Sequence, residues 1–165
     1  MRKTITPLFL FIFSLISFSA QAGIEKNDKT FSINAQLMSS DGEDMLMVMA
    51  SGGLFTTETL ELQGVVLLID AGTLTITGLG ANANLYLPGN NPDFIPYIGA
   101  GGQILNIKDS DPTFGFSETE LSLNAQVGFK QFLAEEIAIN YQLQVISSDS
   151  YDATVASVGL TIFLD

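Results

Sequence analysis

The feature that most constrains the fold of this chain is an alternation of apolar and polar residues with a period of two. It is clearest in FLAEEIAINYQLQV, residues 132–145, whose odd positions from Ile137 onward are apolar and whose even positions include Asn140, Gln142 and Gln144. Successive side chains of a β-strand point to opposite faces, so this pattern predicts a strand. One face of this strand is therefore apolar. The other face carries amides, which are costly to bury without hydrogen-bond partners and therefore need a polar environment.

Seven other segments carry a strand pattern or a short apolar run between turn residues. The expected strands span residues 30–39, 45–51, 59–69, 74–87, 95–107, 120–129 and 154–164. The segment 45–51 is apolar on both faces, so the sequence leaves its orientation open. In the segment that starts at Leu74 the apolar parity changes after Ile76, and we expect a bulge or kink near Gly78.

The polar faces of these segments carry mostly neutral amides and hydroxyls, while the charged residues gather in the connections. A soluble β-sandwich usually places many Lys, Glu and Asp residues on its wet face. Neutral polar residues facing a filled interior, with apolar residues facing lipid, are typical of a transmembrane barrel, and an even number of strands fits as well. We therefore predict an all-β fold, an eight-stranded antiparallel up-and-down transmembrane β-barrel.

In this barrel the polar faces of the strands would point into the lumen. The residues expected to face the lumen are Asn34, Gln36, Glu61, Gln63, Asn124, Gln126, Asn140, Gln142 and Gln144. Strand parity also suggests that Glu61 and Lys130 pair inside the barrel, near one end. Eight strands enclose an interior that side chains just fill, so a wide water channel is not expected.

Two other folds compete with this prediction. A soluble exported β-barrel or sandwich that binds an apolar ligand would place the apolar faces inside and the amides outside. A pilus-type subunit completed by a donated strand is less favoured, because such subunits often carry a disulfide and this chain has no cysteine.

The first residues have the pattern of an export signal. A charged start precedes the apolar run LFLFIFSLISF, which ends at Phe18, and the following SAQAG offers a cleavage site between Ala22 and Gly23. We expect a signal peptide at residues 1–22 and an outer-membrane barrel domain at 23–165. A membrane-anchor helix is the alternative, but the apolar run is shorter than the ~20 residues that a spanning helix needs.

Composition and charge exclude several functions. Beyond residue 22 the chain holds four Lys and 18 Asp or Glu, so it would repel nucleic-acid phosphates and we expect no nucleic-acid partner. The chain has no His and no Cys, which removes the commonest general base and a common nucleophile. We therefore expect no enzymatic activity and no cofactor.

The acidic residues are weak candidates for metal binding or catalysis. Glu135 and Glu136 are adjacent, and adjacent strand residues point to opposite faces, so they form a poor catalytic pair. Asp109 and Asp111 could bind Ca²⁺ through carboxylate oxygens, but they lack the spacing of a calcium loop. Solvated acidic loops are the favoured interpretation, and no metal site is assigned.

An eight-residue pattern, F-x-x-E-x-[LI]-x-[LI], occurs twice, at residues 55–62 and 132–139. Both copies fall where a hairpin is expected, and four strands separate them, so both hairpins would lie at the same end of the barrel. We expect Phe55 and Phe132 to cap these turns at the membrane interface. Chance similarity between two hairpins is the alternative.

Several segments resemble one known group of proteins. PYIGAGGQI, VGFKQFLAEEIAINYQLQV, the final VGLTIFLD and GLFTTETLEL are similar to the small outer-membrane β-barrel superfamily, which includes the OmpA-like transmembrane domain and the OmpX- and OmpW-type barrels. The resemblance runs from about Thr30 to the end of the chain. It departs from the family at Leu164, where an aromatic residue usually stands, and at the additional Asp165.

The resemblance implies a place and a set of partners. The chain would lie in the outer membrane of a Gram-negative bacterium, among lipid and lipopolysaccharide, after insertion by the barrel-assembly machinery. Both chain ends would be periplasmic, and divalent cations could bridge acidic outer loops to lipopolysaccharide. Those loops would span residues 39–44, 70–73, 108–118 and 147–152. The expected role is structural, surface-interacting or related to small solutes, and the OmpW-type resemblance also implies a narrow lateral or apolar path.

Overall fold

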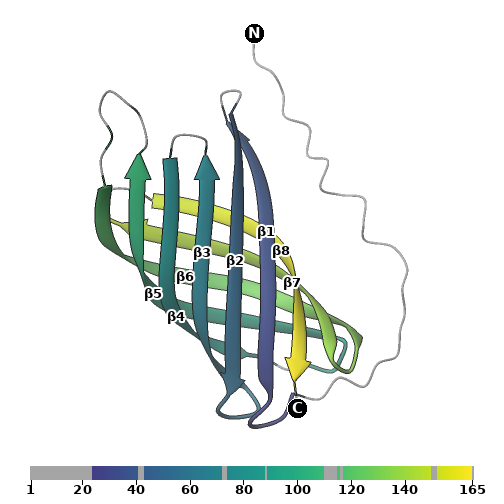
Figure 1. Cartoon of the computed structure of the whole chain (residues 1–165). Helices are drawn as coiled ribbons and strands as arrows, with labels where there is room; N and C mark the ends of the chain where they lie inside the picture. Colours follow the sequence, from purple (N-terminus) through teal and green to yellow (C-terminus); the bar gives the residue numbers. More distant parts are fainter. Residues whose placement is uncertain are drawn as a thin grey trace.

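The computed structural model describes residues 24–40, 43–71, 74–87, 89–109, 115, 117–149 and 152–164. Within these residues eight antiparallel strands form a closed barrel in chain order, and β8 closes it by pairing with β1 (Figure 1). The strands are β1 (Lys29–Ser40), β2 (Glu43–Phe55), β3 (Leu60–Ala71), β4 (Leu74–Tyr86), β5 (Phe94–Asp109), β6 (Ser117–Ala134), β7 (Ile137–Ser148) and β8 (Asp152–Leu164). The predicted fold class is confirmed. The expected signal peptide and its cleavage site at Ala22 and Gly23 lie outside the described residues.

The end of the barrel where β1 begins and β8 ends is referred to here as the lower end, as in Figure 1, and the opposite end as the upper end. Strands run further than the sequence suggested, so the connections at the upper end are short. They lie between Ser40 and Glu43, Ala71 and Leu74, Asp109 and Ser117, and Ser148 and Asp152. Each of these connections is therefore shorter than the loop expected from the sequence.

The outer surface of the barrel is apolar and its interior is not uniformly so. In β6, Leu121 and Leu123 are 67% and 64% exposed, while Ser122 and Asn124, which alternate with them, are buried. The same alternation places large aliphatic side chains on the outside of the other strands. A soluble β-barrel requires the reverse arrangement, because exposed apolar area of this extent is unfavourable in water.

The prediction of a bulge or kink near Gly78 is wrong. β4 pairs with β3 and with β5 in continuous register through this residue. Even-numbered residues of β4 face inward along the whole strand, so Ile76 and Gly78 are buried while Thr77 and Leu79 are exposed. The apolar parity changes because the interior itself becomes apolar toward the upper end, not because the strand kinks.

The expected position of the repeated phenylalanines is also wrong. β6 continues to Ala134, with a register irregularity against β7 between Phe132 and Ala134, so the turn to β7 comes later than the sequence suggested. Phe55 and Phe132 are 0% and 3% exposed and lie inside the barrel rather than at a lipid interface. Burial within the lower end removes more of their apolar surface from water than an interfacial position would.

Candidate functional site

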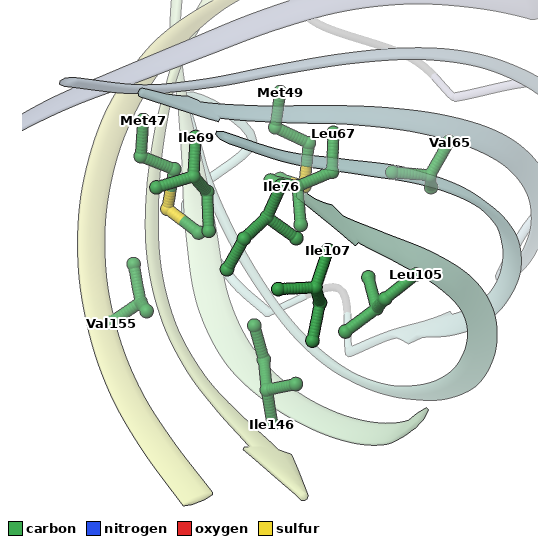
Figure 2. Close-up of a cluster of buried hydrophobic side chains, with 10 residues drawn as sticks. All are labelled: Met47, Met49, Val65, Leu67, Ile69, Ile76, Leu105, Ile107, Ile146 and Val155. Carbon is green, nitrogen blue, oxygen red and sulfur yellow. The ribbon is translucent and has the colours of Figure 1, made fainter. Parts of the chain in front are cut away.

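The upper part of the interior is a cluster of aliphatic and methionine side chains, which converge from six strands (Figure 2). Its buried members are Met47, Met49, Val65, Leu67, Ile69, Ile76, Leu105, Ile107, Ile146 and Val155. Met47 and Met49 settle the orientation of β2, which the sequence left open: they point inward, and Val48 between them is less buried. The upper part of the lumen is therefore apolar on six of the strands, while β6 places the buried Glu120 and Ser122 at this level.

The lower part of the interior is closed by aromatic side chains. The cluster consists of Phe55, Tyr86, Ile95, Tyr97, Phe132, Ala138 and Phe163. Ring centroids lie 5.0 Å apart for Phe55 and Tyr86, 5.2 Å for Tyr86 and Tyr97, and 5.0 Å for Phe132 and Phe163. These tilted contacts are the favourable geometry for aromatic pairs. The interior thus has an apolar layer at each end.

Between the two clusters lies a polar layer, and it holds the residues expected to face the lumen. The structure places Asn34, Asn124, Gln126, Asn140, Gln142 and Gln144 in buried positions inside the barrel, Glu61 at 0% exposure, and Gln36 and Gln63 in half-buried positions. Several of them bond to one another. The Asn140 side-chain amide donates to Asn34 at 2.9 Å, and the Tyr97 hydroxyl donates to Asn140 and Gln142 at 3.0 Å each.

Inward-facing glycines make room for these amides. Gly99, Gly101 and Gly159 lie directly across from Asn84, Asn82 and Asn34 on the neighbouring strands. A Cβ atom on any of the three glycines would lie 2.0–2.2 Å from the amide oxygen opposite, well inside van der Waals contact. These glycines are therefore the packing partners of specific amides.

A buried acid and a buried base lie toward the lower end. Glu61 accepts hydrogen bonds from the hydroxyls of Thr30 and Tyr86, the latter at 2.7 Å, and from the side-chain amides of Gln63 at 3.0 Å and Asn84 at 3.3 Å. These donors satisfy most of the carboxylate's capacity to accept hydrogen bonds. The acid is therefore held in place rather than left available for proton transfer.

The base is Lys130, which is 2% exposed. Its ammonium lies 3.3 Å from the hydroxyl of Thr161 and sits over the rings of Tyr86 and Phe163, with 5.6 Å and 5.4 Å to the ring centroids. It also attracts Glu61 electrostatically. Sequence parity suggested a pair of Glu61 and Lys130. The structure places both inside the lower part of the barrel, where they attract each other without a direct ion-pair contact. Parity missed the hydroxyls and rings around them, since only the barrel's closure brings β1, β4 and β8 to this point.

One wall of the polar layer has unused hydrogen-bonding atoms. Among the buried atoms without a protein partner in the described part of the chain are Nε2 of Gln103, Oγ of Ser122, Oδ1 of Asn124 and Oε1 of Gln126, all on β5 and β6. Buried polar atoms usually find a partner, so this wall can accept water or another small hydrogen-bonding group.

The acidic candidates do not converge. The described residues contain no group of three or more His, Cys, Asp or Glu side chains that could hold a metal ion. Asp109 is half-buried at the upper end of β5, and Asp111 lies outside the described residues. Glu135 and Glu136 are exposed in the turn between β6 and β7. Within the described residues, no helix has the length and apolarity needed to span a membrane.

Comparison with known proteins gives the fold. No family model matches the chain, and no curated protein is significantly similar to it. Among solved structures, the N-terminal β-barrel domain of OprF from Pseudomonas aeruginosa matches with a TM-score of 0.71 and 15% identity, over 84% of this chain and 98% of that one. Neisserial surface protein A (NspA) matches with a TM-score of 0.64 and 13% identity, over 82% and 94%. Ail, the attachment invasion locus protein of Yersinia pestis, matches with a TM-score of 0.59 and 12% identity, over 84% and 99%. The chain thus has the fold of the small outer-membrane barrels.

Proposed function

We propose that this chain is a non-catalytic barrel of the outer membrane, and that it acts as a stable structural element of the membrane rather than as a water-filled pore. The observation that carries the proposal is the layered interior. A polar layer lies between the aliphatic cluster of the upper part and the aromatic cluster of the lower part. An ion crossing the barrel would have to pass both apolar layers, and apolar constrictions exclude water and ions.

Membrane residence is supported by the outer surface. The strands present large aliphatic side chains outward, as in β6, where Leu121, Leu123 and Val127 are all exposed. The strands, of 12 to 18 residues, are long enough to span a bilayer, for which a tilted strand needs about nine to eleven residues. Ail, whose barrel is similar, is described as an outer membrane protein. The export signal expected at residues 1–22 fits the same location.

Within that location a structural role is favoured over recognition of a large partner. The upper connections are short, the longest lying between Asp109 and Ser117. A standard protein–protein interface involves about 20–30 residues on each side, and connections of two to seven residues supply few of them. The buried amide and charge network instead stabilises one arrangement of the barrel.

The test combines location, folding and conductance. The protein should remain in the membrane fraction after urea extraction, and it should migrate differently on SDS gels before and after boiling. After reconstitution into planar bilayers it should show no steady ionic current. A stable ohmic conductance would contradict the sealed interior, and recovery as a detergent-free soluble protein would contradict membrane residence.

A further inference from the structure

The seam between β1 and β8 is closed over only part of its length. The two strands pair from Lys29 with Leu164 to Ala35 with Val158, which is seven residue pairs. Every other pair of neighbouring strands in the described chain has at least ten. Yet β1 continues to Ser40 and β8 begins at Asp152. Above Ala35 and Val158 the facing strand edges therefore have no partner across the seam (Figure 1).

The unpaired edges lie at membrane depth. Six residue steps separate Lys29 from Ala35, and at ~3.3 Å per step and a tilt of about 40° the pairing ends about 15 Å above its first residue pair. The apolar band of such a barrel is about 25 Å tall, so the seam opens in its upper part and widens toward the upper interface. Unpaired backbone groups are costly in hydrocarbon, so a polar group from the upper leaflet would be favoured there.

An apolar groove on the outside of the barrel ends at this opening. Its volume is about 710 Å³, within the range of small-molecule sites. At the seam it is lined by Gln36, Ser157 and Val158, and away from the seam by Gln142 and by apolar and aromatic side chains such as Phe129 and Leu143. Phe129 stacks between Phe94 and Tyr141, with centroids 4.2 Å and 4.6 Å away, which gives the groove a firm wall.

The groove meets the interior at the same place. A small internal cavity of about 10 Å³ is lined by Met47, Met49 and Val155 of the upper apolar cluster, and also by Gln36 and Ser157. The Oε1 atom of Gln36 is buried without a hydrogen-bond partner. Gln36 and Ser157 thus stand between the lipid-facing groove and the interior, because they line both.

We propose that the groove and the open seam bind a long-chain fatty acid. Its chain lies along the apolar groove, pointing toward the lower end, and its carboxyl group lies in the seam. There the carboxylic acid donates to Gln36 and accepts from Ser157 or from the unpaired backbone. One chain and a small head follow from the groove's volume of about 710 Å³ and from the cavity behind the seam, which holds about one water. The inference rests on the proposed membrane location.

The absence of tryptophan allows a direct binding test. Two single-Trp reporters are reconstituted in phosphatidylcholine vesicles: Tyr141→Trp in the groove wall and Leu79→Trp on the exposed face of β4, away from the groove. The probe is 9,10-dibromostearic acid, which quenches tryptophan on contact. We expect saturable quenching of the Tyr141→Trp reporter and only weak, linear quenching of the Leu79→Trp reporter.

Two further variants in the Tyr141→Trp background test the assigned contacts. Gln36→Leu removes the acceptor at the seam and should weaken binding about fivefold, the effect of one lost hydrogen bond. Ala156→Phe fills the groove and should abolish saturation. A gel shift on boiling is recorded for each variant, so that only folded barrels are compared.

The outcomes separate the two proposals. Equal quenching of both reporters, or no effect of Ala156→Phe, would overturn the fatty-acid site while leaving the membrane barrel intact. Saturable quenching by a dibrominated phosphatidylcholine would also overturn it, because the groove would then hold an intact lipid. Failure of the protein to float with the vesicles would instead refute membrane residence.

Discussion

The inward glycines of β5 offer the sharpest test of how the interior is packed. A Cβ atom at Gly101 would lie 2.0 Å from the amide oxygen of Asn82 and 2.2 Å from the carbonyl oxygen of Ala81. The Asn82 side chain can rotate away. The Ala81 carbonyl cannot, because it belongs to the backbone of the paired strand, which would have to move by about 1 Å to reach normal contact. At Gly99 the nearest backbone atom, the carbonyl oxygen of Ala83, is 3.0 Å away. Gly64 faces outward with nothing within 4 Å.

These distances predict how much each of the three alanine substitutions changes the free energy of unfolding. Overpacking a close-packed interior costs about 1–3 kcal/mol, so Gly101→Ala should lower the free energy of unfolding by about 3 kcal/mol and Gly99→Ala by about 1 kcal/mol. Gly64→Ala should be neutral or stabilising by about 0.5 kcal/mol, because alanine restricts the unfolded chain. Urea titration in phospholipid vesicles, read by the fraction that keeps its unboiled gel mobility, gives all three values. Equal effects of Gly101→Ala and Gly64→Ala would refute the close approach of β4 and β5.

Three other predictions concern the layers of the interior. Lys130→Met leaves the Glu61 carboxylate buried without its cation and should destabilise the barrel by about 3–5 kcal/mol in the same urea titration; adding Glu61→Gln should recover most of that loss. Phe163→Ala removes a ring from the lower cluster and should cost about 3 kcal/mol, whereas Leu164→Ala, which truncates an exposed side chain, should cost less than about 1 kcal/mol. Combining Leu67→Ser and Leu105→Ser makes the upper apolar layer polar and should raise ion conductance in planar bilayers above that of the unmodified protein; unchanged conductance would argue that this layer is not the barrier.

The sequence determined the class of fold because the period-two pattern follows directly from backbone geometry. Alternation placed Asn140, Gln142 and Gln144 on one face of a strand and the apolar residues on the other, whatever the rest of the chain does. The neutral character of the polar faces then favoured a lipid-facing barrel. Parity also suggested that Glu61 and Lys130 could meet, since both lie on inward faces near one end.

Only the tertiary structure decided which side chains of different strands meet inside the barrel. Whether Ile76 faces outward or into an apolar part of the interior depends on the side chains that β2, β5 and β7 bring to the same level. The period-two pattern alone cannot distinguish the two cases. The partnership of Gly101 with Asn82 depends on the register between two strands, which many distant contacts set together. The unpaired upper seam depends on closure, because β1 and β8 are far apart in the chain and meet only when the other six strands have fixed the barrel's circumference.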